Sequence, residues 1–319
     1  MEEYNNKIPI VVIVGPTASG KSKLAIWLAK QIGGEIISAD SMQIYKGMDI
    51  GTAKLIAEEL SQVPHHMINL IDKNQSFSVA DYVKISTNVA CDIIKRDAIP
   101  ILVGGTGLYV DSLIDGIIFH DQKEDMNIRK QLYNELSSFG SDYMLNKLKK
   151  IDPKYAKTLH PNNTKRVLRG IEIYIKTGIT MSENLKASKI NGSRFNACKI
   201  GLNFSNRQNL YDRINARVDE MIEKGLIDEA KEIIKFGKCS DTAMQAIGYK
   251  EFIPYFAGKQ GIDETISQIK QKTRKYAKRQ LTWFRKDDDI NWIYLDEIDE
   301  QSVKSKLLNI VKCNLNLSI

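Results

Sequence analysis

The sequence predicts an α/β protein in which helices cover a parallel sheet and a separate, all-helical basic segment is inserted. Short, wholly apolar, β-branched runs recur along the chain, as in strands that are buried on both faces. Segments with helical periodicity alternate with these runs, which is the pattern of an α/β sheet. From about residue 121 to residue 195 the strand-like runs stop, and amphipathic helical stretches replace them.

The N-terminal part of the chain repeats the order strand, helix, strand. Residues 8–14, IPIVVIV, predict a buried strand, and residues 22–32 predict a helix that ends at a pair of glycines. The run EIISA then predicts a second strand, which closes a strand–helix–strand unit. A helix over residues 79–95 and a strand over residues 99–105 continue the alternation.

The C-terminal part returns to strands and helices after the insertion. Residues 198–205, CKIGLNFS, predict a strand that rejoins the sheet, and residues 206–234 predict one long helix. Residues 270–286 hold eight basic side chains and no acidic one, interleaved with aromatic residues. Such a segment suits either a nucleic-acid backbone with stacked bases or a core helix with solvated lysines. The predicted domains are an α/β core (residues 1–120 and 196–319) and a helical insertion (residues 121–195).

The composition is that of an ordinary globular protein, with 319 residues, 43% hydrophobic and 27% charged. No apolar run approaches the ~20 residues that span a bilayer, and the first residues lack the basic and apolar regions of a signal peptide. Four scattered cysteines without C-x-x-C spacing favour reduced thiols, so we expect a cytoplasmic protein. The four histidines lack metal-ligand spacing and are expected to be structural.

The net charge of +7 is concentrated in the predicted insertion. Residues 121–195 hold fifteen Lys or Arg against eight Asp or Glu, which accounts for the whole excess. A basic helical insertion in an otherwise balanced protein suits a grip on a polyanion. The alternative is a solvated helical face, which a charge run taken alone favours.

A glycine-rich phosphate-binding motif lies between the first predicted strand and helix. Gly15-x-x-x-x-Gly20-Lys21-Ser22 is a complete P-loop, so the core is expected to be P-loop NTPase-like. Backbone N–H groups and a helix N-terminus attract phosphate oxygens, Lys21 reaches the phosphates, and the Ser22 hydroxyl is a ligand for Mg²⁺. A diphosphate or nucleotide is therefore predicted to bind at Gly15, Pro16, Thr17, Ala18, Ser19, Gly20, Lys21 and Ser22.

The acid that usually accompanies a P-loop is missing from its usual place. An ATPase or GTPase of this class carries an Asp at the end of a second apolar strand, whereas the strand over residues 99–105 runs into Thr106 without an acid. Asp40 stands at the carboxyl end of another strand, which faces the same crevice as the P-loop. From the residues alone, Asp40 is a Mg²⁺ ligand, a general base for an acceptor, or the cap of the following turn.

A series of motifs resembles the tRNA dimethylallyltransferase family over nearly the whole chain. The motifs, in order, are GPTASGKS, ISADSMQIYKGMDIGTAK, PHHMINLID, FSVADY, PILVGGTGLYVDSLIDG, TKRVLRGIEIY, YDRINARVDEMIEKGLIDE, AMQAIGYKE and QLTWFRK. The family fold is a P-loop α/β core with a helical insertion that grips tRNA. The resemblance therefore favours the polyanion grip for residues 121–195.

The resemblance implies that the diphosphate is a leaving group. In the family, a dimethylallyl group passes from dimethylallyl diphosphate to the exocyclic amine of the adenosine on the 3′ side of a tRNA anticodon. The resemblance implies that charge on the departing diphosphate is stabilised by Lys21, by Mg²⁺ and by Arg217, with Arg213 as a further contributor. Asp40 is implied to accept the proton of the amine, and Thr106 to hydrogen-bond the adenosine or the diphosphate. No phosphoryl group moves, which accounts for the missing second acid.

The resemblance also implies segments that contact the tRNA, whose target adenosine has to be extruded from its stack. Basic side chains over residues 165–169 are implied to meet phosphates and flipped bases, and Gln245 to read a base edge. A packed helix face is the structural alternative for residues 165–169. The implied contact residues are Asp40, Ser41, Met42, Gln43, Thr106, Lys165, Arg166, Val167, Leu168, Arg169, Gln245, Ala246, Ile247, Gly248, Tyr249 and Lys250.

Three residues depart from the family pattern. Ser22 stands where many members have Thr, which the chemistry tolerates. Met42 and Lys250 stand where arginines are common, so a guanidinium contact is missing at the first and a point charge replaces a planar fork at the second. Nothing resembles the C-terminal zinc finger that some eukaryotic members append, which favours an enzyme of the bacterial type. We also expect a monomer without a membrane partner.

Other functions fit parts of the sequence. A P-loop kinase of a small metabolite or nucleotide would use the phosphate motif but would leave the basic insertion without a role. A prenyltransferase of free adenine nucleotides would not need so extensive a surface for tRNA. A non-catalytic RNA-binding protein would have no use for an intact P-loop and Asp40.

Overall fold

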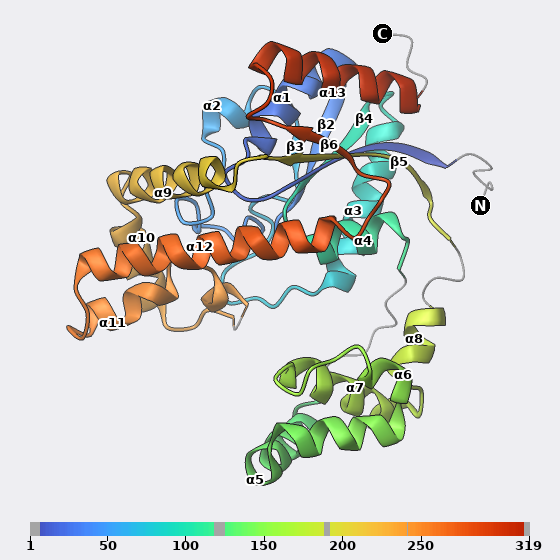
Figure 1. The fold of residues 1–319 in the computed structure, drawn as a ribbon, viewed down its shortest axis with the longest axis vertical. Helices are drawn as coiled ribbons and strands as arrows, with labels where there is room; N and C mark the ends of the chain where they lie inside the picture. Colours follow the sequence, from blue (N-terminus) through green and yellow to red (C-terminus); the bar gives the residue numbers. More distant parts are fainter. Residues whose placement is uncertain (1–6, 118–124, 188–191, 241, 316–319) are drawn as a thin grey trace. The chain divides into compact units, whose positions relative to one another are not determined.

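The computed structural model describes residues 7–117, 125–187, 192–240 and 242–315 (Figure 1). The chain separates into two compact units, one of residues 1–114 and 193–319 and one of residues 115–192. The larger unit contains the sheet, and the described part of the smaller one is all-helical. The predicted boundary between residues 120 and 121 lies outside the described residues, whereas Phe195, expected to end the insertion, belongs to a strand of the larger unit.

The described part of the larger unit has one parallel sheet of six strands in the order β3-β2-β4-β1-β5-β6. The strands are β1 (Ile8–Val14), β2 (Gly34–Ala39), β3 (His65–His66), β4 (Ile99–Gly104), β5 (Phe195–Asn203) and β6 (Asn291–Tyr294). The parallel sheet and its first strands confirm the prediction, although β4 lies between β1 and β2. The last predicted strand begins at Phe195 rather than at residue 198. Because all strands are parallel, the loops after β1, β2 and β4 leave the same edge of the sheet.

Helices pack on both faces of the sheet. The helices of this unit are α1 (Lys21–Ile32), α2 (Ala57–Leu60), α3 (Val79–Ile94), α4 (Gly107–Ile114), α9 (Arg207–Glu223), α10 (Leu226–Phe236), α11 (Ile253–Phe256), α12 (Ile262–Phe284) and α13 (Glu300–Leu315), with 3₁₀ turns η1 (Ala243–Gln245) and η2 (Lys250–Phe252). The prediction of one long helix over residues 206–234 is wrong. Gly225 adopts a left-handed φ of 96°, which ends one helix and starts the next.

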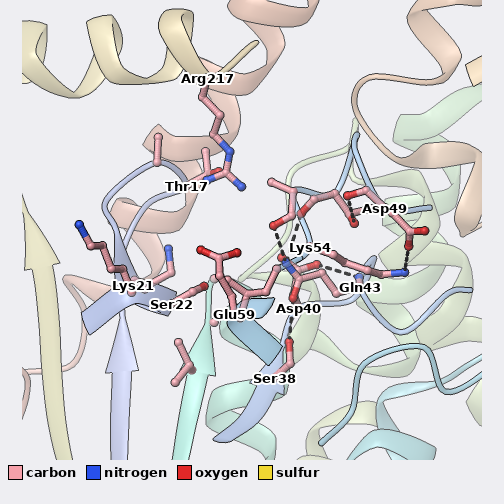
Figure 2. Close-up of a pocket in the computed structure, with 18 of the residues that line it drawn as sticks. Thr17, Lys21, Ser22, Ser38, Asp40, Gln43, Asp49, Lys54, Glu59 and Arg217 are labelled. Carbon is pink, nitrogen blue, oxygen red and sulfur yellow. Dashed lines mark hydrogen bonds and ion pairs between the residues drawn. The ribbon is translucent and has the colours of Figure 1, made fainter. Parts of the chain in front are cut away.

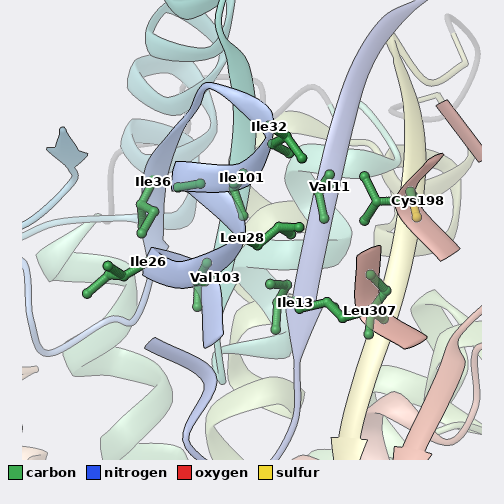
Figure 3. Close-up of a cluster of buried hydrophobic side chains, with 14 of the residues drawn as sticks. Val11, Ile13, Ile26, Leu28, Ile32, Ile36, Ile101, Val103, Cys198 and Leu307 are labelled. Atoms are coloured by element: carbon green, nitrogen blue, oxygen red, sulfur yellow. The ribbon is translucent and has the colours of Figure 1, made fainter. Parts of the chain in front are cut away.

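The central strand β1 is buried on both faces, as its sequence predicted. Val11 and Ile13 pack with α1 and α13 in one cluster, which Figure 3 shows. Ile10 and Val12 point to the opposite face and pack with side chains of α3 and α4. This alternation follows from the period of two along a strand and gives the P-loop a rigid support.

The smaller unit is a helical bundle of α5 (Met126–Ile151), α6 (Pro153–Ala156), α7 (Thr164–Thr177) and α8 (Met181–Ala187). Gly140, with φ 81°, interrupts the regular helix inside α5. A small core of Leu132, Met144, Leu148, Val167 and Ile171 holds α5 against α7. Across the described ranges of the chain, no helix combines the length and apolarity needed to cross a membrane.

Candidate active site

The P-loop connects the buried strand β1 to α1 and wraps around the first turn of the helix. Gly15 has a φ of 147°, and a Cβ added there would lie 2.5 Å from the Leu202 carbonyl oxygen of β5. Gly20 adopts a left-handed φ of 79° as the N-cap of α1. Glycine is required at both positions because of close approach and conformation, so the loop exposes backbone N–H groups beside a helix N-terminus.

Lys21 starts α1 and directs its ammonium group back into the loop. Its Nζ donates a hydrogen bond of 2.7 Å to the Pro16 carbonyl oxygen. Burial and, to a smaller extent, the nearby Arg217 lower the pKa of Lys21 to about 7, with Asp40 partly opposing them. An incoming anion would favour the charged form of this lysine, so the loop is arranged for a phosphate group.

Two arginines of α9 face the P-loop. Arg213 Nε donates a hydrogen bond of 3.0 Å to the Ala18 carbonyl oxygen, and its guanidinium group lies 5.6 Å from the centre of the Phe204 ring. Burial lowers the pKa of Arg217, and Asp40 and Glu220 partly offset this effect. The positive groups of Arg217 and Lys21 therefore lie close enough to repel each other, with Asp40 nearby as the compensating charge.

Asp40 follows β2 directly and shapes the turn that comes after it. Its Oδ1 accepts hydrogen bonds from the backbone N–H groups of Met42, at 2.8 Å, and Gln43, at 3.3 Å. Within the described residues Oδ2 has no hydrogen-bond partner. The turn-capping role considered for Asp40 is thus present, and the second oxygen is left for a ligand.

Thr106, at the end of the loop after β4, is tied to the same turn. Its backbone N–H donates to the Ala39 carbonyl oxygen at 3.1 Å, and its Oγ1 accepts from the Ser41 N–H at 3.1 Å. Gln43 extends the network, since its Oε1 accepts from Ser38 Oγ at 3.2 Å and its Nε2 donates to the Thr52 carbonyl oxygen at 3.2 Å. The loops after β2 and β4 therefore form one hydrogen-bonded wall, called here the acceptor wall (residues 40–43 and 105–106).

One cavity of about 1080 Å³ joins the P-loop to the acceptor wall. Lys21 and Ser22, Arg217, and Asp40 line it together, as Figure 2 shows. Further lining residues come from the P-loop, from strands β2 and β4, from residues 43–59 and 65–69, and from α9 and α12. Gly105 lines the cavity, whereas Thr106 is not among its lining residues. The structure thus brings together the residues predicted for phosphate binding and for the base, from segments that are far apart in the sequence.

The sequence interpretation missed several side chains that line or support this cavity. Tyr276 and Gln280 of α12 lie along it, one helical turn apart. Glu229 of α10 accepts hydrogen bonds from the N–H groups of residues 49, 50 and 51 and from the Tyr249 hydroxyl, at 2.7–3.0 Å. The aromatic residues within the basic stretch 270–286 were the available signal, because they indicated a packed face on α12.

The predicted contact residues in α7 divide into two groups. Lys165 and Arg166 are exposed, whereas Val167 and Leu168 are buried in the core of the helical unit. Arg169 Nη1 lies 3.0 Å from the Glu172 carboxylate, whose side chain is only 1% exposed. The side chains of Val167 and Leu168 are buried in this core, so they cannot contact a tRNA as the resemblance implies.

A similar division holds for residues 245–250. Gln245 is exposed, and Lys250 Nζ donates to its carbonyl oxygen at 3.0 Å. Ala246, Gly248 and Tyr249 are buried, and the Tyr249 ring fills the space beside Gly51. This segment packs against the loop over residues 49–51, and few of its side chains are exposed to solvent.

The fold and the site define a P-loop α/β protein with a crevice for an anionic ligand and a carboxylate opposite the phosphate loop. Family models described as IPP transferase and isopentenyl transferase match residues 43–287 and 8–76. The chain belongs to the tRNA dimethylallyltransferase family.

Relatives and solved structures of this family match nearly the full length. A tRNA dimethylallyltransferase of Halothermothrix orenii is 49% identical over 95% of this chain and 93% of its own, and that of Bacillus subtilis is 44% identical over 95% and 96%. The crystal structure of a tRNA isopentenylpyrophosphate transferase from Bacillus halodurans has 44% identity and a TM-score of 0.73, covering 97% of both chains. A eukaryotic dimethylallyltransferase captured acting on tRNA has 32% identity and a TM-score of 0.81, covering 98% of this chain and 80% of that one.

Proposed function

We propose that the protein transfers a dimethylallyl group from dimethylallyl diphosphate to the exocyclic amine of the adenosine 3′ to a tRNA anticodon, releasing diphosphate. The observation that carries the proposal is a single cavity that holds Lys21 and Arg217 opposite Asp40. Its volume, about 1080 Å³, is slightly above the usual range for ligand pockets and leaves room for a donor and a base together. Names of relatives support the same reaction.

The donor's diphosphate fits the P-loop side of the cavity. Charge builds on the diphosphate as the bond from the allylic carbon breaks, and Lys21, Arg217 and the P-loop N–H groups stabilise that charge. Lys21 gains its proton more readily as the anion enters, because the opposing repulsion from Arg217 is then neutralised. Arg213 acts here by holding the Ala18 carbonyl, which keeps the loop in shape.

Magnesium fits the same position. Ser22 lies in the first turn of α1 and lines the cavity together with Asp40, so both offer oxygen atoms, which Mg²⁺ prefers. No group of three or more His, Cys, Asp or Glu side chains suited to a metal occurs in the described part of the chain. Ser22 and the donor's own phosphate oxygens would therefore hold the ion, which would supply further charge neutralisation of the leaving group.

Asp40 is the base in this proposal. An exocyclic amine is a weak nucleophile and must lose a proton when the new carbon–nitrogen bond forms. The turn fixes Oδ1 through two N–H groups, so Oδ2 can accept that proton without disturbing the backbone. Thr106, held by Ser41 and Ala39, would hydrogen-bond the adenosine or the diphosphate and so help to position the two reactants.

The tRNA would be bound by basic, exposed side chains. Lys165 and Arg166 on α7 are available to phosphates, and their charge adds to the excess in residues 121–195. Gln245 is the exposed residue that could read a base edge, and Lys250 is bonded to it. We place this reaction in the cytoplasm, with the protein acting as a monomer.

A transfer assay tests the proposal directly. Purified protein is incubated with Mg²⁺, radiolabelled dimethylallyl diphosphate and unmodified tRNA from its host, and the digested tRNA is examined for labelled adenosine. Label in one adenosine beside the anticodon is the expected result. Label in free AMP or ADP instead would identify a nucleotide prenyltransferase, and ATP turnover on small acceptors without any label would identify a kinase.

A further inference from the structure

The buried side chain of Gln280 links two parts of the cavity that lie far apart in the sequence. Its Oε1 accepts a hydrogen bond of 2.8 Å from the Thr17 N–H of the P-loop. Its Nε2 donates a hydrogen bond of 3.0 Å to the Gly105 carbonyl oxygen, in the loop after β4. Gln280 is only 5% exposed, and the oxygen and the nitrogen of its amide each form a hydrogen bond with one of these two loops.

The fit around this amide leaves little room for displacement. A Cβ added to Gly105 would lie 2.0 Å from Gln280 Nε2, so the glycine allows the close approach. One helical turn earlier on α12, Tyr276 lines the same cavity. One turn later, Trp283 Nε1 donates to Asp111 Oδ2 at 2.7 Å, which fixes the helix against α4. The position of Gln280 is therefore set by packing on either side along the helix.

Hydrogen bonds on either side of the Gly105–Thr106 peptide link then connect the donor side with the base. The series passes from Thr17 through Gln280 to Gly105, and the next residue, Thr106, is bonded to Ala39 and Ser41, which flank Asp40. The Thr17 N–H is used by Gln280 rather than by a phosphate, so it sets the shape of the loop and not its charge. Strand β1 positions the P-loop through its pairing with β4, and Gln280 adds a side-chain link between the P-loop and the acceptor wall.

We propose that Gln280 is a positioning residue, which fixes the distance between the phosphate loop and the acceptor wall for the reaction. The proposal rests on the proposed function, because it assumes that a donor in the P-loop meets an acceptor held at Asp40. Transfer requires the allylic carbon and the amine to meet in line, and a misplacement of about 1 Å costs about 10²-fold in rate. Gln280 needs no contact with either substrate to have this effect.

The test compares Gln280→Met with Gln271→Met. Gln271 is an exposed glutamine on the same helix, so the control makes the same chemical change without touching the loops. For Gln280→Met we expect kcat to fall about 10²-fold, with KM for tRNA nearly unchanged. Amide hydrogen exchange is expected to rise in segments 14–18 and 103–107, while the thermal midpoint stays close to that of the control.

A second variant separates the two hydrogen bonds. Gln280→Glu keeps an acceptor for the Thr17 N–H but loses the donor to the Gly105 carbonyl, so exchange should rise in segment 103–107 and not in segment 14–18. Wild-type kcat or unchanged exchange in folded Gln280→Met would overturn the proposal, as would a loss of activity explained by unfolding. If the wild type transfers no prenyl group, the proposed function fails, and the exchange data still decide whether Gln280 couples the two loops.

Discussion

Replacing Asp40 by Asn separates its capping role from its role as a base. The Asn carbonyl oxygen can still accept from the N–H groups of Met42 and Gln43, so the turn should remain and stability should change by less than about 1 kcal/mol. An amide cannot take up the proton, so turnover should fall by about 10²–10⁴, equivalent to about 3–5 kcal/mol of activation free energy. Asp40→Ala, which loses both bonds, should also lose about 2 kcal/mol of stability.

The assay must also exclude an indirect effect through Lys21. Asp40 raises the pKa of this lysine, so its removal lowers that pKa further and leaves less of the charged form near neutral pH. Single-turnover rates should therefore be measured from pH 6 to pH 8, with tRNA binding measured in parallel. If Asp40 is the base, the single-turnover rate of Asp40→Asn stays low at pH 6 while its affinity for tRNA is unchanged. Recovery at pH 6, or turnover within threefold of wild type at every pH, would refute Asp40 as the base.

Three further predictions follow. The pKa of Lys21 is about 7, so this lysine is mostly neutral at pH 8 until an anion binds. Binding of inorganic diphosphate at pH 8 should therefore take up close to one more proton in wild type than in Lys21→Met. Calorimetry in two buffers measures the proton uptake, and equal uptake in the two proteins contradicts the prediction. Lys165→Ala or Arg166→Ala should weaken tRNA binding. Each should also reduce by about 1 the slope of the logarithm of the binding constant against the logarithm of the salt concentration, and an unchanged slope excludes a phosphate contact. Glu172→Ala should destabilise the helical unit by about 2 kcal/mol in urea unfolding, because it removes the buried carboxylate that pairs with Arg169 and Arg129, whose own side chains stay partly exposed. A change under about 1 kcal/mol contradicts this prediction.

The phosphate loop and its strand could be predicted from the sequence because their causes are local. The residues IPIVVIV encode burial on both faces, and the glycines of the P-loop encode its conformation. The helix over residues 22–32 is likewise signalled by periodicity and by the Gly33 stop. The wrong prediction of one helix over residues 206–234 has a local cause as well, because Gly225 adopts a left-handed φ that separates α9 from α10.

The helical insertion shows how charge and packing share one segment. The sequence located its basic excess and its contact motif, but it left open which side chains of residues 165–169 face outward. Tertiary packing places Val167 and Leu168 in the core and pairs Arg169 with Glu172, so Lys165 and Arg166 remain exposed. The same helical period serves both faces, and only the neighbouring helix decides which face is buried.

By itself, the sequence determined the class of fold and the phosphate loop, and it placed Asp40 at the edge of the sheet that the loop faces. The tertiary structure decided the strand order, which inserts β4 between β1 and β2 and so brings Thr106 against the turn of Asp40. It also decided that Gln280, 263 residues away from Thr17, joins the two sides of the cavity. Contacts between distant segments depend on how helices and strands pack, and a local pattern along the chain carries no record of that packing.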